Sequence, residues 1–322
     1  MSSLIPPRPL NTILPLVLLG MVPTYACASC GSAFCTLNTR WDVQGAWTEP
    51  GTRFDFRFEY VDQDQLRHGT DEIEADVIPQ HHDEIRTINR NALLTLDHAF
   101  SEEWSLSATL PLVDRRHDHI HNHHEDDGHV EHFHERWDYS EAGDLRLLGS
   151  YRPEDGDIGI LAGVKLPTGA TDIANDEGEV AERTLQPGSG TMDLVLGGFY
   201  RWRTSKAISW FGQLLWQEAL SEQDDYKPGR HLSLDAGLNY YGGSRLVWMA
   251  QLNLVDKSSD AGAAAEPENS GGRFAYLSPG FSISAGDAMQ LYAFVQQALY
   301  QDVEGVQLTS ERGLTLGLSS RF

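Results

Sequence analysis

The chain lacks the long apolar segments of a helical membrane protein. Beyond its first residues, no apolar run approaches the about 18 residues that a membrane-spanning helix requires. The chain is 40% hydrophobic and has a mean hydropathy of -0.37, values that resemble those of a soluble protein. This composition does not exclude a β-barrel, because half of the side chains in each barrel strand face a polar lumen.

The chain is also poor in positive charge. It holds 24 lysine and arginine residues against 47 aspartate and glutamate residues, which gives a formal net charge of -23. Recognition of nucleic acid requires a basic surface that faces the phosphates. We therefore expect no nucleic-acid partner.

Cysteine is scarce, and all three cysteines lie near the amino terminus, at Cys27, Cys30 and Cys35. We expect residues 29–51 to form a periplasmic segment, where an oxidising compartment favours a small Cys30–Cys35 disulfide loop. The alternative is a periplasmic metal or redox site, since thiolates bind soft metals such as Cu(I). The spacing is not CxxC, and retention of Cys27 in the mature chain would strengthen the metal interpretation.

The first 28 residues have the pattern of a secretory signal peptide. Arg8 precedes an apolar stretch over residues 13–22, and Ala26-Cys27-Ala28 is a processing site of the A-x-A type. Cleavage there makes Ser29 the first residue of the mature chain. The alternative is a lipoprotein acylated at Cys27, although the positions before this cysteine lack the usual leucine.

Stretches of alternating apolar and polar side chains fill the rest of the sequence. In the last of them, Leu314, Leu316 and Leu318 share one phase, while Thr315 and Gly317 share the other. Side chains of a strand alternate between two faces, so each stretch predicts a strand with one apolar and one polar face. The twelve predicted strands span residues 52–61, 86–100, 104–113, 143–152, 158–167, 191–201, 208–218, 231–241, 245–255, 273–284, 289–299 and 312–322.

The spacers between these strands are alternately short and long. The short spacers are rich in Gly, Ser, Asp and Pro, as hairpin turns require. This rhythm places the short turns at one rim of a barrel and the long loops at the other, as in bacterial outer-membrane barrels, where the short turns face the periplasm. We therefore predict an all-β fold for residues 52–322: a transmembrane, antiparallel, up-and-down β-barrel of about 12 strands in the lipid of the bacterial outer membrane.

Aromatic residues support this orientation, because Trp and Tyr prefer the membrane interface. They gather at the ends of the predicted strands that adjoin the short turns. The predicted belt contains Phe100, Trp104, Tyr151, Tyr200, Trp210, Tyr240, Trp248 and Phe322. A soluble β-sandwich has no reason to collect outward aromatic side chains at one end of its strands.

The second long spacer, residues 114–142, is rich in histidine and is predicted to lie outside the cell. It contains eight of the 13 histidines: His117, His119, His121, His123, His124, His129, His132 and His134. If the chain is extended, every second residue from 117 to 123 projects a histidine to one side, which suits binding of Zn, Cu or Ni. The alternatives are a solvated loop of low complexity without a selected function, and a pH sensor, since unperturbed histidines titrate near about 6.5.

Polar side chains of the inward phase predict the lining of the lumen. They are Asp55, Arg57, Glu59, Asp144, Arg146, Lys165, Asp193, Arg201, Asp235 and Arg321. Both signs of charge are present, so the lining suits either an aqueous path or a plug of paired charges. About twelve strands enclose a lumen between those of filled eight-stranded barrels and open sixteen-stranded porins, which leaves the pore state open. Inward aromatic residues such as Phe199 and Tyr292 either contact a ring-containing or apolar solute or fill a narrow barrel.

Three segments carry a family resemblance. They read GDLRLLGSYR at residues 143–152, VKLPTG at 164–169 and PGSGTMD at 187–193. These segments resemble outer-membrane proteins of the family associated with the meta-pathway of phenol degradation, and the match spans most of the barrel. The resemblance implies a porin-like channel for small, aromatic molecules. The histidine-rich spacer and the cysteine-bearing amino terminus depart from the family pattern.

These observations predict a passive outer-membrane channel for small-molecule solutes, including aromatic or apolar ones, with metal binding at the histidine-rich spacer and no required cofactor. One alternative is a metal-capturing receptor or a barrel for metal uptake or efflux. Another is an enzyme like the outer-membrane phospholipases, which carry Ser and His on the outer wall. Here His98 has the lipid-facing phase, but no serine stands at an evident cross-strand position, and catalysis needs a base within reach of its nucleophile. We expect no enzymatic activity, and the oligomeric state does not follow from the sequence.

Overall fold

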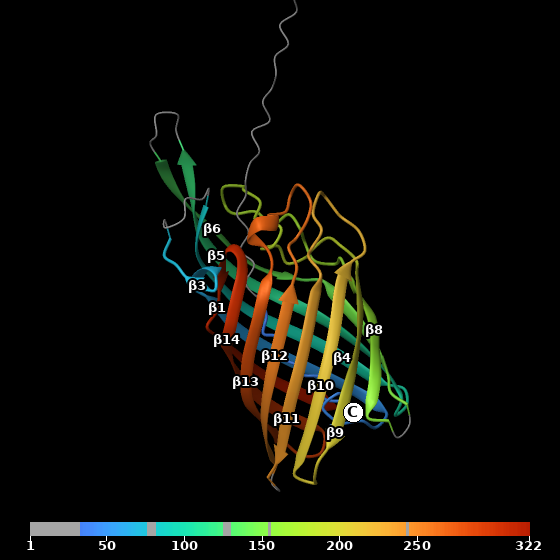
Figure 1. Ribbon diagram of the computed structural model, residues 1–322. Coiled ribbons are helices and arrows are strands. Elements are labelled where there is room, and N and C mark those ends of the chain that lie inside the picture. The colour runs from blue at the N-terminus through green and yellow to red at the C-terminus, as the bar shows by residue number, and fades with distance from the viewer. Residues whose placement is uncertain (1–32, 76–81, 125–129, 154–155, 243–244) are drawn as a thin grey trace, which may run out of the picture.

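The computed structural model describes residues 33–75, 82–124, 130–153, 156–242 and 245–322. Within these ranges, twelve antiparallel strands close one barrel (Figure 1), which confirms the predicted architecture. The barrel strands are β1 (Gly51–Gln63), β4 (His82–Ala99), β5 (Trp104–His124), β7 (Leu145–Tyr151), β8 (Ile158–Leu166), β9 (Asp193–Arg203), β10 (Ile208–Ala219), β11 (His231–Tyr241), β12 (Leu246–Lys257), β13 (Gly272–Ser284), β14 (Met289–Thr309) and β15 (Arg312–Arg321). Their bounds agree closely with the predicted ones at the short-turn rim.

The last strand closes the ring on the first. β15 runs antiparallel to β1, with Arg53 opposite Arg321 and Val61 opposite Gly313. On its other side β1 pairs with β4, and each later barrel strand pairs with the next. A closed ring gives the backbone N–H and C=O groups partners in neighbouring strands, which a hydrocarbon environment demands.

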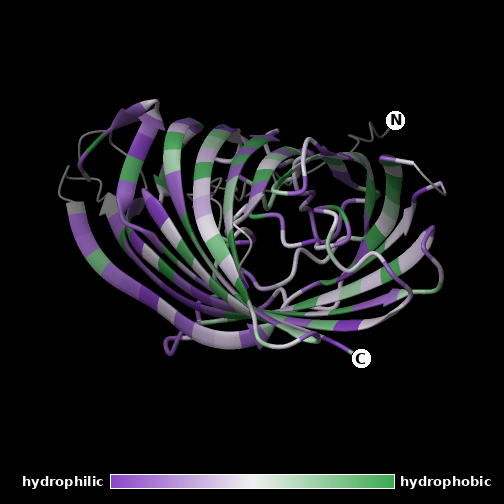
Figure 2. Ribbon diagram, turned by 90° about the horizontal axis from the view of Figure 1, so that it is seen from below, coloured by the Kyte–Doolittle hydropathy of each residue, from purple (hydrophilic) through white to green (hydrophobic). Residues whose placement is uncertain are grey.

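The two faces of the barrel differ as the alternation predicts. On the outer face, large apolar side chains such as Leu96 and Leu316 are exposed. On the inner face, polar side chains such as Asp55, Glu59 and Asn253 are buried. Viewed from the short-turn end, the strands show hydrophobic bands alternating with hydrophilic ones (Figure 2). An apolar exterior of this kind suits contact with lipid.

The predicted aromatic belt lies on the outer face at the short-turn rim. Its exposed members include Phe100, Trp104 and Trp248. Neighbouring rings contact one another: the centroids of Trp104 and Tyr151 lie 4.5 Å apart. Exposed aromatic rings at one level of the outer wall are typical of a membrane interface.

At the long-loop rim, paired strands continue beyond the barrel. β5 forms a hairpin with β6 (Val130–Ala142), which projects at the upper left in Figure 1. β14 pairs with β2 (Gln65–Gly69), and β2 pairs with β3 (Asp71–Glu72). The spacers 62–85, 114–142 and 300–311, which the sequence pattern left as loops, therefore contain paired strands. The only helical element of the described ranges is a short 3-10 turn, η1 (Pro267–Asn269), so none of their helices is long and apolar enough to span a membrane.

Residues 33–47, which we call the plug segment, run through the inside of the barrel and lead to β1. Cys35, Leu37 and Trp41 pack in one buried cluster with Tyr292 and Phe294 of β14. Coil segments are visible within the ring of strands in Figure 2. The expected periplasmic position of this segment is therefore wrong for the part that the structure describes. Cys27, Cys30 and the predicted signal peptide lie outside the described residues.

Candidate functional site

The plug segment is held by side chains that project inward from the barrel wall. The backbone N–H of Asn38 donates to Gln251 Oε1 at 3.1 Å, and Gln251 Nε2 donates back to the Asn38 carbonyl at 2.9 Å. The backbone N–H of Cys35 donates to Glu59 at 3.1 Å. An irregular segment has no strand partner, so polar groups of the wall satisfy its backbone instead.

Basic side chains of the wall bind carbonyls of the plug segment. Arg57 Nη1 donates to the Leu37 carbonyl at 3.2 Å, and Arg201 Nη1 donates to the Asp42 carbonyl at 2.9 Å. Arg57 also pairs with Glu59, whose side chain is fully buried, at 3.1 Å. Much of the charge predicted to line the lumen therefore anchors the plug segment.

A cavity of about 570 Å³ remains in the lumen. Its lining combines residues 33–40 of the plug segment, inward side chains of the strands, and residues 183, 184 and 186–189 of the spacer between β8 and β9. The basic members are Arg40, Arg57, Arg115, Arg146, Lys165 and Arg183, and the acidic ones are Asp55, Asp97, Asp144 and Asp235. Six basic and four acidic side chains line the cavity. Three of the basic ones, Arg40, Arg57 and Lys165, also pair with carboxylates behind the lining, those of Asp42, Glu59 and Asp193, so the cavity holds charges of both signs.

The spacer over residues 167–192 folds over this cavity at the long-loop rim. Leu185 packs with Trp137 of β6 and Ala181 in a buried cluster. Arg115 Nη1 donates to the Leu185 carbonyl at 2.7 Å and to the Thr184 carbonyl at 3.3 Å. The spacer is thus attached to β5 and β6, and six of its residues line the cavity.

The structure places the ten predicted lumen residues on the inner side of the barrel, in two roles. Asp55, Arg57, Asp144, Arg146, Lys165 and Asp235 line the cavity. Glu59, Arg201 and Arg321 contact residues 33–50, Arg321 through an ion pair with Glu49 at 2.5 Å. Lys165 lies 3.0 Å from Asp193 and 3.2 Å from Asp144. Paired charges therefore occupy part of the lumen, and a cavity occupies another part.

Four arginines of the cavity, Arg40, Arg57, Arg146 and Arg183, each have at least one buried nitrogen without a hydrogen-bond partner in the described chain. Across the ranges that the structure describes, no acceptor lies within reach of Arg146 Nε, nor of Nε and Nη1 of Arg40. Arg40 uses its remaining nitrogen to pair with Asp42 at 3.1 Å. The positive charges of Arg40 and Arg146 also repel each other. Sequence reasoning identified Arg146 but not Arg40, because the plug segment has no regular pattern of inward residues.

The inward aromatic residues mostly fill space. Those that are buried are Phe199, Phe211, Phe274, Tyr276, Tyr292 and Phe294. Tyr292 packs edge-on against Trp41 of the plug segment, with ring centroids 5.0 Å apart. The aromatic residues that do line the cavity are Phe34 and Tyr226. The six buried inward rings therefore fill space inside the barrel and do not line the cavity.

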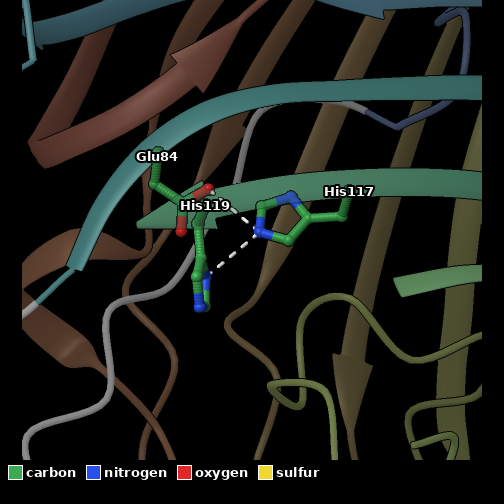
Figure 3. Close-up of side chains that lie close together, drawn as sticks. All are labelled: Glu84, His117 and His119. Atoms are coloured by element: carbon green, nitrogen blue, oxygen red, sulfur yellow. Dashed lines mark hydrogen bonds and ion pairs between the residues drawn. The ribbon is translucent and has the colours of Figure 1, made fainter. Parts of the chain in front are cut away.

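A second group of chemically active side chains lies at the long-loop rim, beyond the predicted membrane-spanning part of β5. Glu84 of β4 and His117 and His119 of β5 are buried, and we call them the histidine cluster (Figure 3). His117 Nε2 lies 3.4 Å from His119 Nδ1 and 3.4 Å from Glu84 Oε2. One ligand atom from each residue lies within 4.8 Å of the other two.

Each imidazole of the cluster is oriented by a contact on its far side. Thr87 Oγ1 lies 2.8 Å from His117 Nδ1, and Glu135 Oε2 of β6 lies 2.7 Å from His119 Nε2. Burial, together with the charge of His121, lowers the pKa of His119 to about 4. Burial also raises the pKa of Glu84 well above its usual range, and the nearby carboxylates of Glu266 and Asp83 raise it further.

The eight predicted metal-binding histidines do not form one site in the described part of the chain. His117 and His119 point to the inner side, but His132 lies on another face and contacts Asn122 Oδ1 through Nδ1 at 2.6 Å. His121 is half-buried and His134 is exposed. His129 and the side chains of His123 and His124 lie outside the described residues. Glu84 and Glu135 were not predicted, because pairing of β4 with β5 and of β5 with β6 brings them to the histidines.

Two further residues that the sequence analysis singled out are Cys35 and His98. Cys35 is a buried free thiol inside the barrel, and its predicted partner Cys30 lies outside the described residues. His98 Nδ1 lies 2.9 Å from Thr52 Oγ1, in a contact between exposed side chains. The ring of His98 also stands edge-on to Phe100, with centroids 4.7 Å apart.

Comparison with known proteins supports the fold. No family model matches the chain, and no curated protein matches it. Among solved structures, the chain is similar to the COG4313 outer membrane channel from Pseudomonas putida F1, with 15% identity, a TM-score of 0.60, and coverage of 85% of this chain and 96% of that one. It is less similar to the CymD monoaromatic hydrocarbon channel, with 10% identity, a TM-score of 0.49, and coverage of 90% and 94%. The first likeness identifies the fold as a β-barrel of the outer-membrane type.

Proposed function

We propose that the protein is an outer-membrane channel for small organic anions. The observation that carries the proposal is the set of arginines that line the cavity, because Arg40, Arg146 and Arg183 each have buried N–H groups without a hydrogen-bond partner in the described lumen. Guanidinium groups bind carboxylates through charge-assisted hydrogen bonds, often in a bidentate way. A carboxylate that enters the cavity offsets the repulsion between the positive charges of Arg40 and Arg146.

The anionic group accounts for the chemistry of the cavity better than an apolar solute does. Most of the buried inward aromatic rings lie outside the cavity lining. Six of the residues that line the cavity are basic. An aromatic solute, which the family resemblance implies, fits this cavity best when it also carries a carboxylate. Phe34 and Tyr226 are the aromatic residues available to contact its ring.

Planar-bilayer recordings of the refolded protein test this function. We expect discrete openings and a reversal potential in a KCl gradient that shows preference for chloride. We also expect benzoate, but not neutral benzyl alcohol, to reduce the chloride current. The variant Arg146→Gln should lose most of this preference, whereas Arg90→Gln, which removes an exposed arginine paired with Asp114 at 2.7 Å, should retain it.

Two outcomes would contradict the proposal in different ways. Absence of openings at all voltages would reject a channel. Openings with equal or cation-favouring selectivity, unchanged by Arg146→Gln, would keep the channel and reject the anionic solute.

A further inference from the structure

We propose that Glu84, His117 and His119 form a binding site for one divalent transition-metal ion of the Zn²⁺ type. This site is separate from the lumen cavity, because none of its three residues lines that cavity. The proposal narrows the histidine-rich spacer from eight candidate ligands to two, and it adds a carboxylate from a different strand.

The spacing of the ligand atoms fits a tetrahedral ion. Two atoms that are each about 2.1 Å from a tetrahedral Zn²⁺ lie about 3.4 Å apart. His117 Nε2 has this separation from both His119 Nδ1 and Glu84 Oε2, at 3.4 Å in each case. Dashed lines in Figure 3 join His117 to both Glu84 and His119, and one ligand atom from each of the three residues lies within 4.8 Å of the other two. Three protein ligands leave a fourth position for water or another donor.

The contacts behind the rings orient their lone pairs toward the cluster. Glu135 accepts a hydrogen bond from His119 Nε2–H, so a neutral His119 presents an unprotonated Nδ1 to the cluster. Thr87 is placed to accept from His117 Nδ1–H, which leaves Nε2 unprotonated as well. Metal-binding histidines almost always have such an acceptor on the second nitrogen, because it fixes the tautomer and the ring orientation.

Local charge favours a cation at the cluster. Neither carboxylate oxygen of Glu84 accepts a hydrogen bond from any residue that the structure describes. The negative charges of Glu266 and Asp83 act on Glu84, so the surroundings are acidic. A buried carboxylate is stable when it is paired or coordinates a metal. A bound ion would also connect β4 with β5 and, through His119 and Glu135, with β6 at the base of the projecting hairpin.

Titration of the refolded full-length protein with Zn²⁺, followed by calorimetry, tests the site. We expect one tight site per chain, and at least about a 100-fold weaker affinity in His117→Ala and Glu84→Gln, since even an outer-shell partner contributes 10–100-fold. Glu135→Gln should weaken binding by about 10–100-fold. His134→Ala is the matched control: this histidine is exposed on the same hairpin, and its loss should leave the tight site unchanged.

Heat-modifiable migration in gels shows that each variant remains a folded barrel before its affinity is compared. Replacement of Zn²⁺ by Co²⁺ supplies a second readout, because a tetrahedral site gives strong visible absorption that His117→Ala should abolish. Equal Zn²⁺ affinity in the wild type, His117→Ala and Glu84→Gln would overturn the proposal, as would a loss confined to His134→Ala. Channel recordings are not needed, so failure of this site leaves the channel proposal standing.

Discussion

One side chain of the barrel wall satisfies both backbone polar groups of a residue inside the barrel. Gln251 of β12 accepts a hydrogen bond from the N–H of Asn38 and donates one to its carbonyl, at 3.1 Å and 2.9 Å. The two residues are 213 positions apart in sequence. Gln251 thus supplies the backbone hydrogen bonds that a strand receives from a neighbouring strand. These bonds position Asn38, which lines the cavity.

Replacement of Gln251 by Leu should loosen the plug segment. The change leaves the buried N–H of Asn38 without its acceptor, which costs about 1–3 kcal/mol. The Asn38 carbonyl keeps one donor, because Gln44 Nε2 also donates to it, at 2.8 Å. We expect a larger single-channel conductance in planar bilayers because the segment leaves its position more often. Gln290→Leu is the control, since Gln290 is a buried amide of β14 for which no bond to the plug segment is found in the described chain. Equal conductance of Gln251→Leu and the wild type would contradict this role.

The pair formed by Arg57 and Glu59 should contribute to stability as a unit. Glu59 is fully buried, and Arg57 supplies its counter-charge at 3.1 Å. Arg57→Met leaves a buried carboxylate uncompensated, so we expect a loss of about 3–5 kcal/mol in the free energy of unfolding. The double variant Arg57→Met with Glu59→Leu should lose less than Arg57→Met alone. Urea unfolding of the protein in liposomes measures both, and a double variant less stable than the single one would refute the coupling.

The sequence predicted the barrel well because its strands obey one strong rule. Lipid on one side and the polar lumen on the other require alternation, so in any correct register Leu314 faces the lipid and Thr315 faces the lumen. Turn length then orders the rims. Strands at the long-loop rim lie outside the membrane and need no apolar face. The hairpin of β5 and β6 therefore lacks the alternation that predicts a strand.

The plug segment was missed for a different reason. Its position depends on hydrogen bonds to side chains from distant strands, such as Gln251 and Glu59, which no local pattern reports. One signal was present: Cys35, Leu37, Trp41 and Val43 give this short segment four apolar side chains, all of which are buried. The histidine cluster shares this limitation, because Glu84 joins the histidines only through the register of β4 with β5.

The thiol of Cys35 should be protected in the folded barrel. A Cβ atom at Gly313 of β15 would lie only 2.7 Å from Cys35 Sγ, so this glycine makes room for the side chain. In a chain carrying Cys27→Ser and Cys30→Ser, we expect slow maleimide labelling, and at least about tenfold faster labelling after Gly313→Val. Gly212→Val is the control, because the nearest atom to a Cβ at Gly212 lies 3.8 Å away. Rapid labelling of the folded parent would show that the plug segment lies elsewhere.

Arg115 should hold the 167–192 spacer over the cavity. It donates to the carbonyls of Thr184 and Leu185, and hydrogen bonds from a charged donor contribute about 1.5–3 kcal/mol. Arg115→Met should therefore release the spacer, raise conductance and speed tryptic cleavage after Arg183 from outside.

The adjacent residue supplies a matched control for Arg115. Arg116 pairs with Asp118 at 3.1 Å and makes no hydrogen bond with the spacer among the described residues. Arg116→Met therefore removes the same charge and one tryptic site without releasing those carbonyls. If the two variants behave alike in conductance and cleavage, charge rather than tethering explains the effect. If only Arg115→Met changes both, the spacer acts as the restriction at the long-loop rim, because the same bonds that bury Leu185 then also limit entry to the lumen.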